Sequence, residues 1–172
     1  DRGDYAKAIL IYQQSMDSAA LRADSLSYYD SKLDVACVYD RLDELPKAIE
    51  MTEPLLDAFI RLGDSSIIGR AYSTLAAFYG RAGMFEKCAA TAQKGLQIAK
   101  KYGNTSERCA AYNQLAYAYT RQGHWAEALP LLDTALAIQL ASGVFHQLPI
   151  YYLNIGSTHR ELGQWKEARH YL

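Results

Sequence analysis

Residues 70–103, RAYSTLAAFYGRAGMFEKCAATAQKGLQIAKKYG, form the unit from which the chain is built. The same order of residue types returns at steps of forty residues on both sides of this stretch. Seven of the eleven glycines fall at two positions of this period, which tandem duplication explains and chance does not. The first position holds Gly3, Gly83, Gly123 and Gly163, with Asp43 in one copy; the second holds Gly63, Gly103 and Gly143, with Ala23 in one copy.

Each copy predicts two helices, with the glycine positions as the stops between them. Apolar side chains recur at steps of three and four residues, which is the spacing of a helix with one buried face. Gly63 suits a helix end, and Asp64 after it suits the cap of the next helix. The predicted helices cover residues 4–22, 25–41, 45–62, 65–82, 84–102, 106–122, 125–142, 148–162 and 164–172.

The period predicts one array over residues 1–172. It consists of a partial repeat at 1–23, repeats at 24–63, 64–103 and 104–143, and a partial repeat at 144–172. The chain opens on the second helix of one pair and ends inside the second helix of another. We therefore expect it to be an excised segment of a longer array.

Composition narrows the classes of function. With 18 basic and 19 acidic residues the net charge is -1, so we expect no direct nucleic-acid binding, which needs a clustered positive surface. The apolar runs are far shorter than the ~20 residues of a membrane span, so no membrane association is expected. Cys37, Cys88 and Cys109 are odd in number and lack a CxxC spacing. They predict buried, reduced thiols in a cytoplasmic protein.

The sequence offers no catalytic, metal-binding or cofactor-binding motif. Histidines 124, 146, 159 and 170 are scattered, without the helical spacing of a metal site such as HExxH. A phosphate-binding glycine loop and a nucleophile elbow are also absent from the sequence. Cys37 has no histidine in the matching repeat phase, so it is not expected to act as a nucleophile. We predict a protein without intrinsic catalysis, metal or cofactor.

Residue types within each unit resemble one known repeat family. A large residue is followed by an apolar-small pair, an aromatic, Gly-x-aromatic and a small residue. In the third unit these are Tyr72, Leu75-Ala76, Tyr79, Gly83, Phe85 and Cys88; in the fourth they are Tyr112, Leu115-Ala116, Tyr119, Gly123, Trp125 and Ala128. This order resembles the tetratricopeptide repeat (TPR), and the forty-residue length is similar to the long repeats of LGN/Pins-type adaptors, kinesin light chains and bacterial regulators of the MalT type. The resemblance implies an all-α, right-handed superhelical solenoid of antiparallel helix pairs.

The TPR resemblance further implies that the first helix of each pair lines a concave groove for a peptide or partner helix. We hypothesise that Asn113, Gln114 and Asn154 hold the backbone of an extended ligand, because amides both donate and accept, and that Tyr117 contacts it. The alternative is that these are solvated polar side chains. The repeat phase places on this face Asp30, Leu33, Asp34, Cys37, Asp40, Arg70, Ser73, Thr74, Ala77, Arg81, Asn113, Gln114, Tyr117, Arg121, Ile150, Leu153, Asn154, Ser157 and Arg160.

Arg41, Arg81 and Arg121 share one phase and form a predicted ladder along one edge of the groove. Their guanidinium groups suit the carboxylates or phosphorylated residues of a ligand. The alternative is that each arginine sits at a helix end, where a cation stabilises the helix by about 0.3–1 kcal/mol. Arg81 and Arg121 are therefore candidate groove residues.

Three hypotheses for the function stay open on the sequence. The first is a protein-interaction module that binds a partner peptide, as the scaffold or regulatory segment of a larger signalling protein. The second is a sensory or oligomerisation array in a bacterial transcriptional regulator or sensor kinase, responding to a small effector. The third is a structural spacer. Apolar faces on the first and last helices also predict end-to-end self-association of this segment.

Overall fold

The computed structural model describes residues 2–102, 105–143, 145 and 148–172. These residues form nine α-helices and no β-strand, and the bounds lie within about two residues of those predicted. The all-α prediction is confirmed. The helices are α1 (Arg2–Leu21), α2 (Ser25–Arg41), α3 (Leu45–Leu62), α4 (Ser65–Arg81), α5 (Phe85–Tyr102), α6 (Thr105–Arg121), α7 (Trp125–Ala141), α8 (Leu148–Glu161) and α9 (Trp165–Tyr171).

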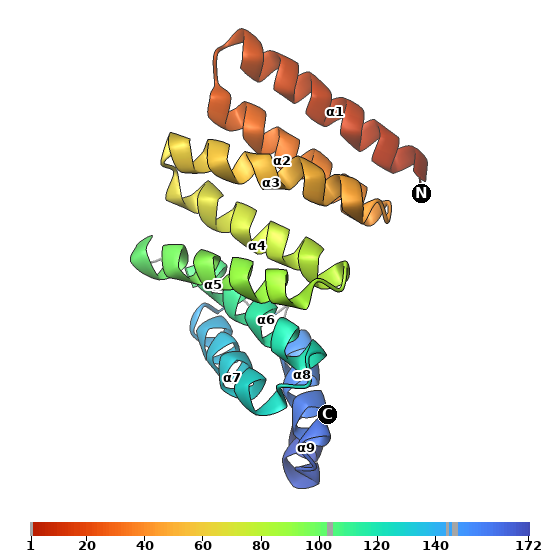
Figure 1. Ribbon diagram of the computed structural model, residues 1–172, viewed down its shortest axis with the longest axis vertical. Coiled ribbons are helices and arrows are strands. Elements are labelled where there is room, and N and C mark those ends of the chain that lie inside the picture. The colour runs from red at the N-terminus through yellow and green to blue at the C-terminus, as the bar shows by residue number, and fades with distance from the viewer. Residues whose placement is uncertain (1, 103–104, 144, 146–147) are drawn as a thin grey trace.

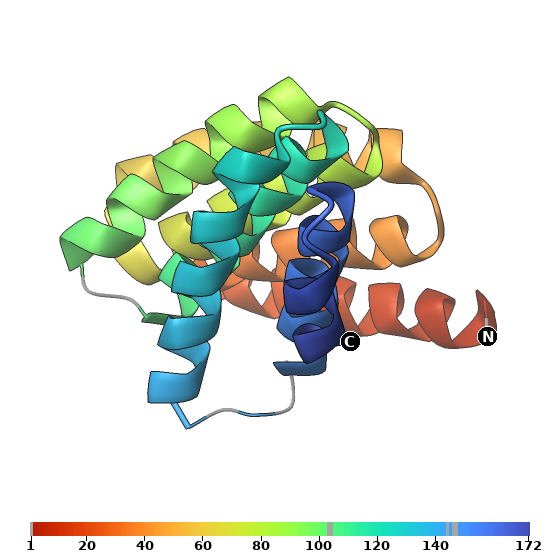
Figure 2. The same ribbon diagram turned by 90° about the horizontal axis from the view of Figure 1, so that it is seen from below.

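The helices stack in chain order along one axis, with α1 at one end and α8 and α9 at the other (Figure 1). Each helix packs mainly on the helices before and after it, as expected for a repeat array. Seen from below, α5 and α7 lie on the outer side of the stack, with α6 and α8 toward its inside (Figure 2). The first helices α4 and α6 also pack on each other, whereas the backbones of α6 and α8 stay further apart.

The helix ends explain why glycine recurs. Gly63 and Gly83 have φ angles of 75° and 76°, in the left-handed region that costs a residue with a Cβ about 1–2 kcal/mol. Ala23 and Asp43 replace glycine at the same positions of the period and still adopt φ of 54° and 65°. The duplicated geometry is therefore kept even where the glycine has been lost.

Aspartates cap two of the helices, and the cap at Asp64 was predicted. The Asp24 side chain accepts from the Ser27 amide at 3.0 Å, and Asp64 accepts from the amides of Ser66 and Ile67 at 3.0 and 3.3 Å. Such caps satisfy amide groups that have no partner within the helix.

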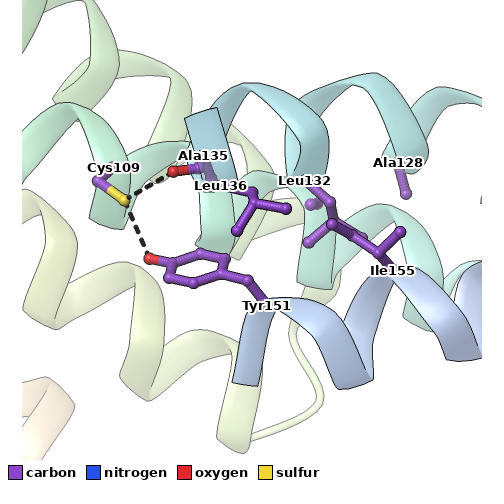
Figure 3. Packing of buried hydrophobic residues seen from close by; sticks show 8 residues of the cluster. Cys109, Ala128, Leu132, Ala135, Leu136, Tyr151 and Ile155 are labelled. Carbon is purple, nitrogen blue, oxygen red and sulfur yellow. Dashed lines mark hydrogen bonds between the residues drawn. The ribbon is translucent and has the colours of Figure 1, made fainter. Parts of the chain in front are cut away.

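Small and large side chains interlock in the core between the helices. Ala36, Ala76 and Ala116 are fully buried at one position of the period, which lets neighbouring helices approach closely. Between α6, α7 and α8 the core is partly polar (Figure 3). The thiol of Cys109 lies 3.0 Å from the hydroxyl oxygen of Tyr151 and donates to the Ala135 carbonyl at 3.4 Å. This buried contact ties α6 to both following helices.

The cysteines are free thiols; Cys88 and Cys109 are buried as predicted, whereas Cys37, for which burial was also predicted, is half-buried. Burial raises the pKa of each thiol, and that of Cys88 reaches about 11. All three are therefore protonated at neutral pH. In the described part of the chain, no helix is long and apolar enough to cross a membrane. Those same residues include no group of three or more His, Cys, Asp or Glu positioned to hold a metal ion.

Candidate ligand-binding face and pocket

We use the term first-helix face for the surface that α2, α4, α6 and α8 present together, where the predicted groove residues lie. Between α2 and α4 this surface is held by ion pairs. Arg70 contacts Asp30 at 2.8 Å and Asp34 at 2.5 Å, and Arg81 contacts Asp40 at 2.5 Å. The acidic start of the face is therefore neutralised by the next repeat, and Arg81 is occupied by a carboxylate of its own chain.

Partial burial raises the pKa values of two carboxyl groups on this part of the face, those of Asp34 and Glu107. The pKa of Asp34 is raised, because desolvation outweighs the attraction of Arg70 and Asp30 adds repulsion. The pKa of Glu107 is also raised, chiefly by desolvation, although Ser73 donates a hydrogen bond to its carboxylate at 3.1 Å. These acids are stabilised by specific neighbours within the array.

The prediction that Leu33 lines the groove is wrong, and Asn113 is more buried than a groove-lining side chain was expected to be. Leu33 has no exposed surface, because it packs with Leu55 and Phe59 in the core between α2 and α3. Asn113, at the same position of the period, is half-buried, and its Oδ1 is shielded without a hydrogen-bond partner among the described residues. Gln114 lies nearby, and its backbone carbonyl accepts from the Cys88 thiol at 3.6 Å. The ligand-holding roles of Asn113 and Gln114 stay predictions.

Tyr117 fills the space between α4 and α6. A Cβ atom on Gly80 would lie 3.0 Å from the Tyr117 ring, so glycine is what allows this close approach. The ring also meets Phe85 edge-on, with centroids 6.3 Å apart and planes at 71°. The Arg121 guanidinium lies 5.5 Å from the Phe85 centroid, within cation-π range.

A pocket of about 250 Å³ opens between α6 and α8. Tyr117, Arg121 and Asn154, three of the six predicted site residues, line it; Arg81, Asn113 and Gln114 do not. The lining consists of Tyr117, Thr120, Arg121, Trp125, Leu132, Asn154, Ser157, Thr158, Arg160 and Glu161.

The lining of this α6–α8 pocket includes two arginines and one carboxylate, Glu161. The described residues provide no carboxylate partner for Arg121, and Arg160 contacts only the adjacent Glu161, at 3.3 Å between two exposed side chains. Such an exposed pair contributes little, about 0–1 kcal/mol. The lining can therefore offer guanidinium donors and the Asn154 amide to a ligand.

Comparison with known proteins agrees with this architecture. The tetratricopeptide repeat family model matches residues 67–141 and 107–172, more than half of the chain. The chain belongs to the tetratricopeptide repeat family. No curated protein matches this TPR array.

Solved structures resemble the TPR array in fold. A putative kinesin light chain of Podosopora anserina with nearly identical TPR-like repeats shares 20% identity at a TM-score of 0.74, covering 99% of this chain and 84% of that one. The apo form of RapI shares 16% identity at a TM-score of 0.83, covering 99% and 47%. A signal transduction ATPase of Pyrococcus horikoshii with a TPR sensor shares 14% identity at 0.66, covering 93% and 28%. At these identities the likeness concerns the fold alone.

The sequence did not indicate every residue that lines the α6–α8 pocket. Trp125 was assigned only to the repeat core, and Thr120 and Glu161 were not singled out, yet all three line the pocket. A signal was present in the repeat alignment, because Ser157 stands where the preceding repeat has Tyr117. A small residue replacing a large one between similarly stacked helices predicts a gap.

Proposed function

We propose that this TPR array is a non-catalytic protein-interaction module that binds a segment of a partner protein on its first-helix face. The observation that carries this proposal is the α6–α8 pocket, where Tyr117, Arg121 and Asn154 converge on one concave site. The setting suits a peptide, since an aromatic ring offers apolar contact while guanidinium and amide groups fix orientation. We place the module in the scaffold or regulatory segment of a larger cytoplasmic signalling protein.

The charge distribution supports binding at the C-terminal half of the face. Between α2 and α4 the arginines are paired with aspartates of the same chain, so a ligand would have to displace Asp40 to reach Arg81. Arg121 stacks near Phe85 and keeps its donors available at the pocket. A partner segment with a carboxylate or phosphate therefore finds its basic contact at Arg121 and not at Arg81.

The test begins with a random peptide library displayed on phage and selected on the intact chain. Dissociation constants of selected peptides are then measured for the wild type, for the double variant Arg121→Gln/Asn154→Ala and for Arg81→Gln. We expect the double variant to weaken binding about tenfold or more, through loss of a charged and a neutral hydrogen bond. Arg81→Gln is the matched control and should stay within about twofold. Equal affinities for all three proteins would refute the proposed site.

The volume of the pocket favours a second candidate, a sensory array that responds to a small effector. A site of about 250 Å³ with guanidinium, amide and hydroxyl groups suits a compact polar molecule. Thermal unfolding in the presence of a set of small anionic metabolites separates the two candidates. A raised melting temperature that the Arg121→Gln/Asn154→Ala variant loses, together with no selected peptide, would favour the effector.

Self-association of this segment is a further part of the proposal. The terminal helices expose large apolar side chains: Leu10 and Ile11 on α1 are 59% and 62% exposed, and Trp165 on α9 is 67% exposed. Contact between such faces of two copies would bury apolar surface. Light scattering over a range of concentrations should show mass increasing with concentration, and a constant monomer mass would contradict this.

A further inference from the structure

The α6–α8 pocket lies where the preceding junction of the array holds a tyrosine ring. Forty residues separate Tyr117 from Ser157, and the same shift relates Phe85 to Trp125. Tyr117 packs against Phe85, whereas Ser157 and Trp125 both line the open pocket. The two junctions therefore have matching aromatic walls, but only the first has a ring between its helices.

Replacement of the tyrosine by serine accounts for the empty space. A serine side chain ends at its hydroxyl, so the six-membered ring that Tyr117 places beside Phe85 has no counterpart beside Trp125. The helices do not close over the gap, because the backbones of α6 and α8 stay further apart than those of α4 and α6. The volume of about 250 Å³ exceeds the ~150 Å³ of apolar cavities known to bind benzene.

The pocket lining combines apolar and polar groups. Leu132, which is 1% exposed, and the aromatic Trp125 supply apolar surface. Arg121, Arg160, Asn154 and Glu161 supply polar and charged groups. A planar ring entering from a peptide would bury its faces against Trp125 and Leu132 and leave its edge near polar groups, as Tyr117 does at 38% exposure in the filled junction.

A small side chain alone does not create such a site elsewhere on this face. At the junction of α2 and α4 the same position of the period holds Ala77, but the wall residue there is Leu45 in place of an aromatic. The Arg81 side chain also crosses to Asp40 at that junction. The combination of a missing ring and an aromatic wall occurs at α6–α8.

We infer that the α6–α8 pocket takes a phenylalanine or tyrosine side chain from the partner, which lies beside Trp125 as Tyr117 lies beside Phe85 one repeat earlier. This inference rests on the proposed function and names the residue class that anchors the partner segment. The partner thereby supplies the ring that the repeat lacks.

The direct test titrates p-cresol, the side-chain analogue of tyrosine, into the full chain and follows amide and indole signals by NMR. We expect saturable shifts at the Trp125 indole and at Ser157 and Asn154. Ser157→Tyr fills the pocket from within and should abolish these shifts, while Ser157→Ala, the matched control, should retain them. Absence of shifts in the wild type, or equal shifts in Ser157→Tyr, would overturn the inference.

A second variant that fills the pocket is needed in case the new tyrosine ring of Ser157→Tyr does not fit between the helices. Thr120 stands where Gly80 lies under Tyr117, so Thr120→Gly/Ser157→Tyr also removes the side chain that would crowd the new ring. Circular dichroism confirms that each variant is folded. If both filled variants are folded and still bind p-cresol as the wild type does, the inference is wrong.

The phage-selected peptides distinguish failure of this inference from failure of the proposed function. We expect enrichment of phenylalanine or tyrosine, with affinity reduced at least about tenfold by Ser157→Tyr and by less than about twofold by Ser157→Ala. The aromatic anchor would be refuted, and the proposed function left intact, by selected peptides of one kind. These peptides lack an aromatic residue, lose affinity in the Arg121→Gln/Asn154→Ala variant and bind Ser157→Tyr as tightly as the wild type. Peptides that ignore Arg121 and Asn154 would refute the proposed function, while the p-cresol titration still judges the pocket.

Discussion

The two halves of the first-helix face are built on the same repeat but satisfy their side chains differently. Between α2 and α4, Arg70 and Arg81 reach back to aspartates of the preceding repeat. Between α6 and α8, Arg121 and Arg160 border a pocket, and the ring that would fill it is missing. The repeat fixes where side chains point, and their identity decides whether a junction is closed by its own chain or left open for another.

This difference separates stability from binding. In the closed junction, ion pairs between charged side chains hold neighbouring helices together. Removing the arginine of such a partly buried pair leaves a carboxylate without its cation, which destabilises the fold. The open junction leaves donors and apolar surface without partners in its own chain, and under the proposed function a bound partner would contact them and stabilise the folded chain. We therefore expect substitutions in the first half to change unfolding and substitutions in the second half to change recognition.

The largest effect is expected from opening the closed half with Arg70→Met. Methionine keeps an apolar stem but leaves Asp30 and Asp34 facing each other without a cation. We expect the free energy of unfolding to fall by about 2 kcal/mol at pH 7, measured by urea denaturation. Peptide affinity should stay within about twofold of the wild type. A loss of affinity comparable to that of the Arg121→Gln/Asn154→Ala variant would contradict the division into halves.

The pH dependence of this loss has a defined sign. The folded-state pKa of Asp34 lies above its ordinary value of 3.8, so the folded state holds the proton more tightly than the unfolded state. Stability therefore falls as pH rises through the window between those two pKa values. Arg70 lowers the Asp34 pKa, so its removal should widen this window. The deficit of Arg70→Met should shrink as the pH approaches 4, and a deficit independent of pH would exclude Asp34 as its cause.

Emptying the filled junction should make it resemble the open one. Tyr117→Ser removes the ring that packs on Gly80 and Phe85 and should cost about 1.5 kcal/mol, because the lost side chain is only partly buried. The variant should also gain p-cresol-induced NMR shifts at Phe85, where the wild type has none. Tyr117→Phe is the matched control and should show neither change. No new shifts at Phe85 would break the proposed equivalence of the two junctions.

A smaller effect is expected beneath the open half. Tyr151→Phe removes the hydroxyl that lies 3.0 Å from the Cys109 thiol, while Cys109 keeps its contacts with Ala135 and with Gln139 at 3.3 Å. We expect a loss of about 1 kcal/mol in the free energy of unfolding by urea denaturation. Binding of selected peptides should be unchanged, since Tyr151 does not line the pocket. If the Tyr151→Phe variant is fully folded and still binds the peptides more weakly, the buried contact helps to shape the pocket.

The smallest effect concerns the turns, where the first half has lost glycines that the second half keeps. Ala23→Gly should stabilise the chain by about 0.5 kcal/mol, because Ala23 holds φ at 54° and glycine adopts this region without a steric penalty. Gly63→Ala, at the equivalent position with φ of 75°, is the matched control and should destabilise by about 1 kcal/mol. Thermal unfolding measures both. A destabilised Ala23→Gly variant would mean that the side chain matters more than the backbone at this turn.

Much of the fold was predictable because it depends on local rules. Glycine at fixed steps predicted the helix ends, and the structure shows that the left-handed turn is kept at Asp43, where φ is 65° without a glycine. The groove was less predictable, since Leu33 and Asn113 share one repeat position but face different surroundings. The repeat limits of 24–63, 64–103 and 104–143 stay predictions, as do the ligand-binding roles of the six site residues.

The sequence alone determined that this chain is a stack of helix pairs, because periodic apolar spacing and left-handed stops act within a few residues of each other. Only the tertiary structure decided which arginines are occupied, because Arg70 and Arg81 meet aspartates that lie more than thirty residues away along the chain. It also decided that the missing ring at Ser157 leaves a pocket, since a gap depends on whether the neighbouring helices move in to fill it.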